Sequence, residues 1–316
     1  MTTLSIGKSL YSITIKTEGY PVENSKSTVN EKMESSGGTA LVVSYLLGKW
    51  QVDSYFAGTV GYDDYANSIK KDLESVNTHT TFLETNYEKK TTQSLILSNK
   101  VNKSKTEIMI EPMAYHLKKY DFDFNPDVIY TDGYEYTATM ETINKYSNVT
   151  SVLGASLTYN NVKEILAIAK RVKYVIFSRE LAEKMTSVNV DISNPNTLLS
   201  LYKGVKSVYP DQNVIINLGL NGVIYAINDN VKYLQPIKVN QLDSTGSDDI
   251  FDGAFVYGLA KGYDIEKCIR IANIASGLSN EKEGILISVP SVVDVINYYE
   301  ARFGKVDEAN PSNGNN

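Results

Sequence analysis

The sequence is poor in the residues on which several common kinds of site depend. Its 316 residues include a single cysteine, Cys268, and two histidines, His79 and His116. One cysteine excludes an intramolecular disulfide and a cysteine-based metal site, which favours a reducing compartment. The two histidines are far apart in the sequence and have polar neighbours, so the sequence does not indicate histidine catalysis or a histidine metal cluster.

An excess of positive charge and a long apolar run are also missing. Lys and Arg total 31 against 37 Asp and Glu, which gives a formal net charge of −6. Binding to a phosphate backbone needs clustered cations, so we expect no nucleic-acid partner.

No window approaches the roughly 18 apolar residues of a membrane-spanning helix, and the N-terminus does not resemble a signal peptide. We therefore expect no membrane partner and a cytoplasmic location.

Short apolar runs alternate with amphipathic segments along most of the chain. This alternation predicts strand–helix–strand units and an α/β domain with a mainly parallel central sheet. The strand-like runs, the first of which we expect to form one strand, are 4–15, 52–61, 127–133, 149–155, 172–178 and 213–219. The helix-like segments are 39–50, 63–76, 137–146, 162–171 and 179–185.

Two segments interrupt this alternation. Residues 13–36 are polar and have no helical periodicity, and residues 88–111 read as two strands joined by a turn. Together they predict a small antiparallel β-flap that could act as a lid. We expect a single domain over residues 1–306 and a disordered polar tail at 307–316.

The stretch "QLDSTGSDDIFDGAF", residues 241–255, leads from a small polar loop into an apolar helix. With Gly246 in the loop, free backbone N–H groups and the positive helix end would face an anion such as a phosphate. The alternative is a simple helix cap, because Asp and Ser side chains often accept the first N–H groups of a helix. For Asp252, one turn into the helix, solvent exposure or capping is a sufficient explanation, and Asp243 is expected to fix the approach to the loop.

Three motifs in order make the chain resemble the PfkB/ribokinase family of carbohydrate kinases. They are "SSGGTALVVSYLLGKWQVDSYFAGTVGYDD" from Ser35, "INLGLNGVIYA" from Ile216 and "DSTGSDDIFDGAF" from Asp243. The last is the most specific. The resemblance implies a three-layer ribokinase-like fold and an enzyme that moves the γ-phosphoryl group of ATP, with Mg²⁺, to a hydroxyl of a small sugar-like substrate.

The resemblance also implies roles for individual residues. Asp249 would be the general base, and the backbone of Gly246, Ser247 and Asp248 would form an anion hole. The residues implied to contact the nucleotide are Asn217, Gly219, Gly222, Thr245 and Gly246. Those implied to contact the substrate are Ser12, Gly37, Gly38, Val42 and Asp249. The sequence shows no cluster of metal ligands. Magnesium in such sites depends largely on water and phosphate oxygens, so no metal ligands are assigned.

The chain departs from the family pattern where specificity is set. Ser12 and Val42 stand where an aspartate and an asparagine usually bind sugar hydroxyls, and each lost hydrogen bond weakens binding by about 1 kcal/mol or more. Asp248 replaces a glycine in the anion hole, where a carboxylate pointing inward would repel phosphate. The family's Asn-x-x-Glu motif is also missing, with Ser178 and Leu181 in its place. The rival hypothesis is therefore a weak or inactive homologue that serves as a ligand-binding or scaffold protein.

Several features keep an ordinary structural interpretation beside the functional one. The Gly37-Gly38 pair also suits a simple turn into a helix, and Asn221-Gly222 suits a hairpin turn. Lysines of the flap, Lys100, Lys103 and Lys105, could contact a phosphorylated substrate or only protect a strand edge. By the family resemblance, the flap would also join two subunits into a homodimer. A dinucleotide-binding oxidoreductase is the weakest option, because no Gly-x-Gly-x-x-Gly follows the first strand.

Overall fold

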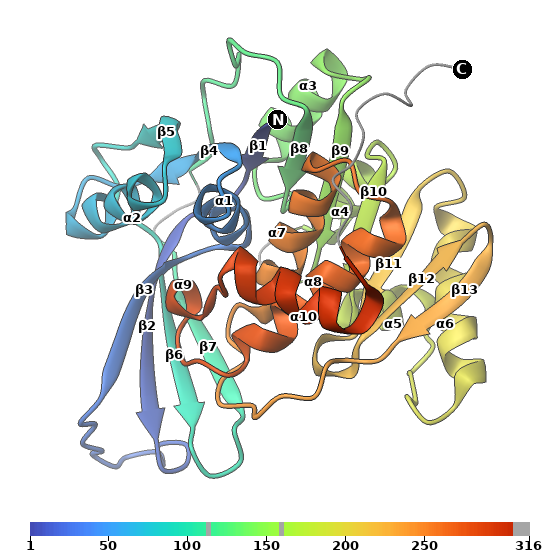
Figure 1. The fold of residues 1–316 in the computed structure, drawn as a ribbon. Coiled ribbons are helices and arrows are strands. Elements are labelled where there is room, and N and C mark those ends of the chain that lie inside the picture. The colour runs from blue at the N-terminus through green and yellow to red at the C-terminus, as the bar shows by residue number, and fades with distance from the viewer. Residues whose placement is uncertain (112–114, 158–160, 306–316) are drawn as a thin grey trace.

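The computed structural model describes residues 1–111, 115–157 and 161–305, so the predicted tail at 307–316 lies outside the described residues. Its centre is a nine-stranded sheet in the order β13-β12-β11-β10-β9-β8-β1-β4-β5 (Figure 1). The strands are β1 (Thr2–Ile6), β4 (Asp53–Val60), β5 (Thr78–Thr85), β8 (Val128–Thr131), β9 (Thr150–Ala155), β10 (Tyr174–Ser178), β11 (Asn213–Asn217), β12 (Val223–Ile227) and β13 (Asn230–Leu234). Only the β11–β12 and β12–β13 pairs are antiparallel. The mainly parallel sheet predicted from the alternating runs is confirmed.

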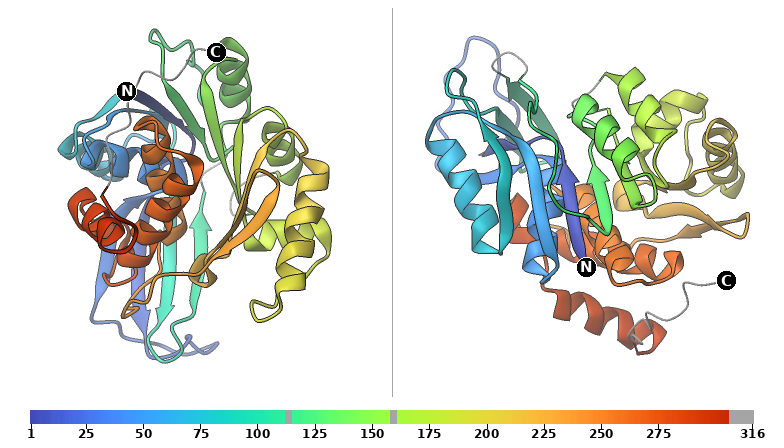
Figure 2. Two further views of the ribbon diagram at one scale, coloured as in Figure 1. Left: turned by 45° about the vertical axis from the view of Figure 1, so that its right-hand side comes forward. Right: turned by 90° about the horizontal axis from the view of Figure 1, so that it is seen from above.

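Helices cover both faces of this sheet, as the views in Figure 2 show. One layer contains α1 (Thr39–Lys49), α2 (Asp64–Ser75), α7 (Ser247–Ala260), α8 (Ile265–Ser279) and α10 (Val292–Phe303), and the other α3 (Tyr136–Lys145), α4 (Val162–Ala169), α5 (Arg179–Thr186) and α6 (Pro195–Val208). Two short helices, η1 (Gly219–Asn221) and α9 (Ile285–Ser288), complete the described helices. Apolar side chains from each layer pack on the sheet in separate clusters, which gives the three-layer α/β fold.

The four strands of the flap form a separate sheet that extends away from the central one (Figure 1). Its order is β3-β2-β6-β7, with β2 (Leu10–Thr17), β3 (Lys32–Gly37), β6 (Gln93–Asn99) and β7 (Lys105–Ile110). The flap was predicted from residues 13–36 and 88–111, and both segments contribute to it. The β2–β6 pair is parallel, so the sheet is mixed and not purely antiparallel.

The first apolar run does not form the single strand that was predicted. It divides at residues 7–9 into β1 of the central sheet and β2 of the flap. Gly7 lies against the side chain of Asp132, where an added Cβ would be 2.1 Å from the carboxylate. The backbone N–H of Lys8 donates to the same carboxylate at 3.0 Å. A close approach that only glycine permits, followed by this hydrogen bond, lets the chain leave one sheet and enter the other.

Within the ranges 1–111, 115–157 and 161–305, no helix is long and apolar enough to cross a membrane. The longest described helix, α8, has 15 residues and supplies buried residues to the core. Its length and burial are typical of a helix packed inside an α/β fold.

Candidate active site

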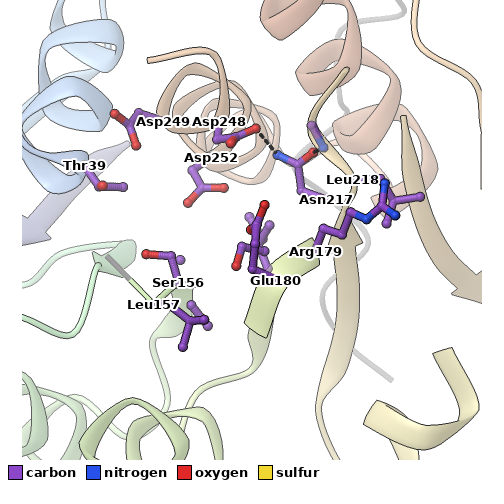
Figure 3. A pocket seen from close by; sticks show the side chains of 15 residues that line it. Thr39, Ser156, Leu157, Arg179, Glu180, Asn217, Leu218, Asp248, Asp249 and Asp252 are labelled. Carbon is purple, nitrogen blue, oxygen red and sulfur yellow. Dashed lines mark hydrogen bonds between the residues drawn. The ribbon is translucent and has the colours of Figure 1, made fainter. Parts of the chain in front are cut away.

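A cavity of about 380 Å³ opens where β9, β10 and β11 end beside the first turn of α7 (Figure 3). Its walls include Thr39 of α1, Glu180 and Asn217 after the strand ends, and three carboxylates of α7. The three are Asp248, Asp249 and Asp252. Open α/β sheets bind ligands at the carboxyl ends of their strands, so the cavity has the expected position for an active site.

The N-terminus of α7 is open to a ligand. Gly246 is its N-cap residue with a φ of 79°, in the left-handed region, and no side chain caps the helix. Asp243 accepts hydrogen bonds from the N–H groups of Thr245 at 2.9 Å and Gly284 at 3.0 Å, so it holds the loop instead of capping the helix. The simple capping interpretation of this stretch is therefore wrong. The first N–H groups of the helix can meet an anion at the cavity, although that of Ser247 also donates to Ser244 O at 3.3 Å.

Asp249 has the electrostatic properties of a base that operates near neutral pH. Burial, with the added negative charges of Asp248, Asp132 and Glu107, raises the pKa of Asp249 from 3.8 to about 7, against a lowering hydrogen bond with the Thr39 hydroxyl. A carboxyl group with a pKa near the working pH is both ionised often enough and basic enough to accept a proton. Figure 3 shows Asp249 beside Thr39 at one end of the cavity.

Asp248 points into the cavity, which is the orientation that the sequence left open. Its Oδ1 accepts a hydrogen bond from Asn217 Nδ2 at 3.0 Å (Figure 3). Desolvation and the charge of Glu180 raise the pKa of Asp248, and the bond from Asn217 lowers it. The Asp248 side chain is nevertheless accessible to the solvent that fills the cavity. A carboxylate thus stands beside the start of α7, the end of the site where the family resemblance implies phosphate, and it would repel an uncompensated phosphate.

Asp252 is not a solvent-exposed or capping residue, in contrast to the expectation from the sequence. Only 6% of its surface is exposed, and its Oδ2 accepts a hydrogen bond from the Tyr130 hydroxyl at 2.7 Å. Desolvation raises the pKa of Asp252 well above its usual value. Helix α7 is buried on nearly all sides, which is why a polar residue in its second turn faces the cavity floor.

The nucleotide-side glycines lie in a tight hairpin between β11 and β12. Leu218 N donates to Gly222 O at 2.8 Å, and Gly222 has a φ of 90°, so the hairpin interpretation is confirmed. Asn217 connects this hairpin to α7, because its Oδ1 accepts the Gly219 N–H at 2.9 Å while its amide group binds Asp248. Asn217 and Gly219 line the cavity, and Gly222 closes the turn behind them.

Apart from Asp249, the residues assigned to the substrate side are buried in the protein. Val42 is completely buried in the core and Ser12 is 3% exposed. Gly38 is the N-cap of α1 with a φ of 100°, and an added Cβ would lie 2.4 Å from Lys8 O. At Gly37, an added Cβ would lie 3.0 Å from both Leu10 and Ser12. The turn into a helix is confirmed, and contact of these four residues with a substrate stays a prediction.

The flap is bound to the loop before α7 by lysines. Lys105 Nζ donates to the Asp243 carboxylate and to Thr245 Oγ1, and Lys103 Nζ donates to Gln241 O at 3.0 Å. Burial alone would raise the pKa of Asp243, but hydrogen bonds from Lys105, Gly284 and Thr245 hold it at about 2. Lysines that the sequence offered for a phosphorylated substrate therefore already have protein partners.

Asp132 is a buried carboxylate near the site that the sequence did not indicate, and its charge helps to raise the pKa of Asp249. It follows β8, and its carboxylate accepts the N–H groups of Lys8 at 3.0 Å, Ala40 at 3.2 Å and Tyr134 at 2.9 Å. Burial raises the pKa of Asp132 to about 6 against these bonds. The residue joins the start of α1 to the β1–β2 connection. Its position directly after a parallel strand was the available signal, since strand ends gather at one edge of such a sheet.

The described ranges contain no group of three or more His, Cys, Asp or Glu side chains arranged to hold a metal ion by themselves. The acidic residues of the cavity are spread along its walls, from Glu180 after β10 to Asp248 on α7. Any cation bound between them would need ligands from another molecule, such as the phosphate oxygens of a nucleotide.

Known proteins resemble the chain in both sequence and fold. Ribokinase from Staphylococcus aureus strain COL is 25% identical over 273 residues, which cover 82% of this chain and 86% of that protein. ATP-dependent ribose-1-phosphate kinase from Halopiger xanaduensis is 23% identical over 95% of this chain and 98% of its own length. The structure of Arabidopsis thaliana ribokinase complexed with ribose and ATP superposes with a TM-score of 0.79 at 16% identity, over 94% of this chain and 97% of that one.

The shared fold defines the class as a ribokinase-like α/β protein. The profile of the pfkB family carbohydrate kinases matches residues 2–292, nearly the whole chain. The chain therefore belongs to the pfkB family of carbohydrate kinases. The fold class and the kinase class predicted from its three motifs are confirmed.

Proposed function

We propose that the protein is an ATP-dependent phosphotransferase that acts on a hydroxyl of a small sugar or sugar-like acceptor. The acceptor oxygen attacks the γ-phosphorus and gives its proton to Asp249, while the bond from the γ-phosphorus to the bridging oxygen of ADP breaks. The products are the phosphorylated acceptor and ADP. The proton leaves Asp249 for solvent after the transfer.

One observation carries the proposal, namely the position of Asp249 at an uncapped helix N-terminus inside the cavity. The helix end supplies N–H donors for the negative charge of the transferred group, and Asp249, with its pKa of about 7, supplies the base. Gly246, Ser247 and Asp248 would contribute their backbone to the anion hole. Asn217 and Gly219 would contact the nucleotide from the hairpin, while Thr245 and Gly222 hold the two turns in shape.

Magnesium would fit the acidic end of the cavity. Mg²⁺ is commonly bound by one or two carboxylates together with substrate phosphates, and Asp248 and Glu180 both face the cavity from opposite walls. Besides desolvation, the negative charge of Glu180 raises the pKa of Asp248. A cation between the two carboxylates would relieve this repulsion. When bound, the ion would neutralise phosphate charge as the transfer proceeds.

The direct test measures ADP release with Mg²⁺-ATP and a panel of acceptors. The panel contains ribose and other free sugars, nucleosides, and sugar phosphates such as ribose 1-phosphate. We expect at least one acceptor to be phosphorylated by the wild type, and at least about 100-fold more slowly by Asp249→Asn. A wild type that gives no more product than this variant with every acceptor would reject the proposal, and calorimetry with ADP would then show whether nucleotide binding persists.

A second function is favoured by a different observation. Val42 and Ser12 are inaccessible, and Asp248 points towards the phosphate end of the cavity. A protein in this condition could bind a nucleotide or a related ligand without transferring phosphate, as a sensor or scaffold. It would bind ADP in calorimetry with an unchanged affinity in Asp249→Asn, and neither form would phosphorylate any acceptor.

The flap supports a homodimer as part of the proposal. Its outer face carries apolar side chains on three strands, and Ile108 and Ile110 of β7 are 47% and 50% exposed. Burial of such side chains against a second copy would stabilise the pair by roughly 25 cal/mol per Å² of apolar surface. Light scattering should give a dimer mass for the wild type and a monomer mass for Ile108→Lys. A monomeric wild type at micromolar concentration would reject this part of the proposal.

A further inference from the structure

The inner face of the flap carries a row of polar side chains across three strands. Ser12 of β2 pairs in register with Ser94 of β6, and Ser94 Oγ donates to Glu107 Oε1 of β7 at 2.5 Å. Side chains on one face of a sheet alternate along each strand, so these three residues share a face with Lys105. Lys105 contacts Asp243 of the loop before α7, and this contact identifies the face as the one turned towards the active site.

Glu107 differs from the other two members of this row. Ser12 and Ser94 are buried, whereas the Glu107 side chain is exposed. Its Oε1 accepts the serine hydroxyl, and within the described part of the chain no hydrogen bond reaches its Oε2 and no lysine or arginine forms an ion pair with it. The nearest cation along the strand, Lys105, is already committed to Asp243. A carboxylate oxygen thus remains available at the flap.

Glu107 also lies close enough to Asp249 to affect the pKa of its carboxyl group. Its negative charge is among the causes that raise the pKa of Asp249. The two side chains come from the two sides of the site, Asp249 from α7 and Glu107 from the flap. An acceptor placed with one hydroxyl on Asp249 would therefore present its remaining groups to the flap.

We propose that Glu107 binds the acceptor by accepting hydrogen bonds from a pair of its hydroxyl groups, and that the acceptor is a neutral polyhydroxylated molecule. The inference rests on the proposed kinase function and deepens it. In the family pattern, an aspartate that binds sugar hydroxyls usually stands at the position of Ser12. The Ser12 side chain has no carboxylate. Ser12 pairs with Ser94, and Ser94 bonds Glu107, which lies opposite Ile96 in the next strand. The carboxylate therefore lies two strands away on the same face, where it remains accessible.

The charge distribution around the flap disfavours a phosphorylated acceptor. Lys16 pairs with Glu283 at 2.5 Å, Lys8 pairs with Glu111 at 2.7 Å, and Lys105 pairs with Asp243. Lys89 and Lys90 border a separate cavity of only about 20 Å³, which has room for roughly one water molecule. Because Lys8, Lys16 and Lys105 are already paired with carboxylates, a phosphate group near Glu107 would meet an unbalanced negative charge, whereas neutral hydroxyl groups would find an acceptor.

The test compares Glu107→Ala and Glu107→Gln with the wild type, using the acceptor that the panel identifies. Loss of hydrogen bonds to a charged group should raise the acceptor KM about 10- to 100-fold in Glu107→Ala, with the KM for ATP changed less than about twofold. An acceptor analogue that lacks one of the two hydroxyls should lose most of this difference between wild type and variant. In Glu107→Gln the pH midpoint of kcat should also fall, because one charge that raises the pKa of Asp249 is gone.

Glu34→Gln is the matched control. Glu34 lies on β3 of the same flap and pairs in register with Ile13, so it faces the opposite side of the sheet from Ser12. We expect its acceptor KM and pH midpoint to equal those of the wild type. Equal effects of Glu107→Gln and Glu34→Gln, or a preference of the wild type for sugar phosphates over the matching free sugars, would overturn the proposal.

Direct binding separates failure of this proposal from failure of the kinase function. Calorimetry with D-ribose and with ribose 1-phosphate, in the presence of ADP, requires no turnover. If no acceptor is phosphorylated but D-ribose binds the wild type at least tenfold more tightly than Glu107→Ala, the kinase function fails and the role of Glu107 stands. If D-ribose does not bind the wild type more tightly than Glu107→Ala, and the KM of every phosphorylated acceptor is unchanged in Glu107→Ala, the role of Glu107 is wrong.

Discussion

The two ends of the active site have opposite character. At the phosphate end, the start of α7 is uncapped and three of its carboxylates border an open cavity of about 380 Å³. At the opposite end, Val42 has no exposed surface and Gly37 is in contact with Leu10 and Ser12. Under the proposed function, the first end would transfer the phosphoryl group and the second would contact the acceptor. Variants at each end should therefore affect different kinetic parameters.

The largest effect is expected at the phosphate end, from Asp249→Asn. Removal of a general base typically slows the reaction by about 10²- to 10⁴-fold, and asparagine keeps the size of the side chain. We expect kcat to fall by that factor, while the ADP affinity from calorimetry stays within about threefold. A loss of ADP binding with unchanged kcat would instead assign Asp249 to the nucleotide and would break the distinction between the two ends.

The next effect concerns the contact between the flap and the phosphate end. Lys105→Met removes the ammonium group that binds Asp243 and Thr245, which fixes the loop leading into α7. Misplacement of a catalytic loop by about 1 Å can cost up to roughly 100-fold, so we expect kcat to fall about 10- to 100-fold. The pH profile should keep its midpoint, because Lys105 acts on position and not on the proton of Asp249.

The control for this prediction is Lys103→Met. Lys103 also joins the flap to the loop, but it binds only the carbonyl oxygen of Gln241 at the exposed end. We expect less than a threefold change in kcat and a similar melting temperature in both variants. Equal losses in Lys103→Met and Lys105→Met would indicate that the flap needs only general anchoring.

The pH dependence of the reaction should reveal the environment of Asp249. The raised pKa of about 7 means that the base is mostly protonated below neutral pH. We expect kcat/KM to fall about tenfold for each pH unit below 7 and to level off above it. A midpoint near 4 would show that the site is fully hydrated during catalysis.

The same raised pKa has a consequence for stability. Between pH 4 and pH 7 the folded protein keeps a proton on Asp249 that the unfolded chain has released, so the free energy of unfolding falls as pH rises through this range. Asp249→Asn removes this penalty. We expect its melting temperature to exceed that of the wild type at pH 8 and to match it near pH 4, and an equal difference at both pH values would contradict this explanation.

Much of the fold could be predicted because strand and helix runs differ in length and periodicity. The site was harder to predict from the sequence than the fold. Helix α7 is buried nearly all round, so no polar face indicated that Asp252 lies at the cavity floor. The proposed role of Glu107 depends on strand register across β2, β6 and β7, in which Ser12 pairs with Ser94 from a distant part of the sequence, and this leaves no local signal. The orientation of Asp248 likewise depends on its tertiary contact with Asn217.

The smallest effect should come from Asp248→Gly. This variant tests how the Asp248 carboxylate affects nucleotide binding at the phosphate end. The Asp248 carboxylate faces the cavity together with Glu180, so it should repel a nucleotide without a cation and attract one that carries Mg²⁺. Calorimetry with ADP in EDTA should show binding several-fold tighter in the variant, whereas binding with Mg²⁺ should change little or weaken. The ratio of the two affinities is the critical quantity, because a general change in the loop would shift both equally. An unchanged ratio would mean that Asp248, held by Asn217, turns its charge away from the phosphates, and the acidic phosphate end would then pose no barrier to transfer.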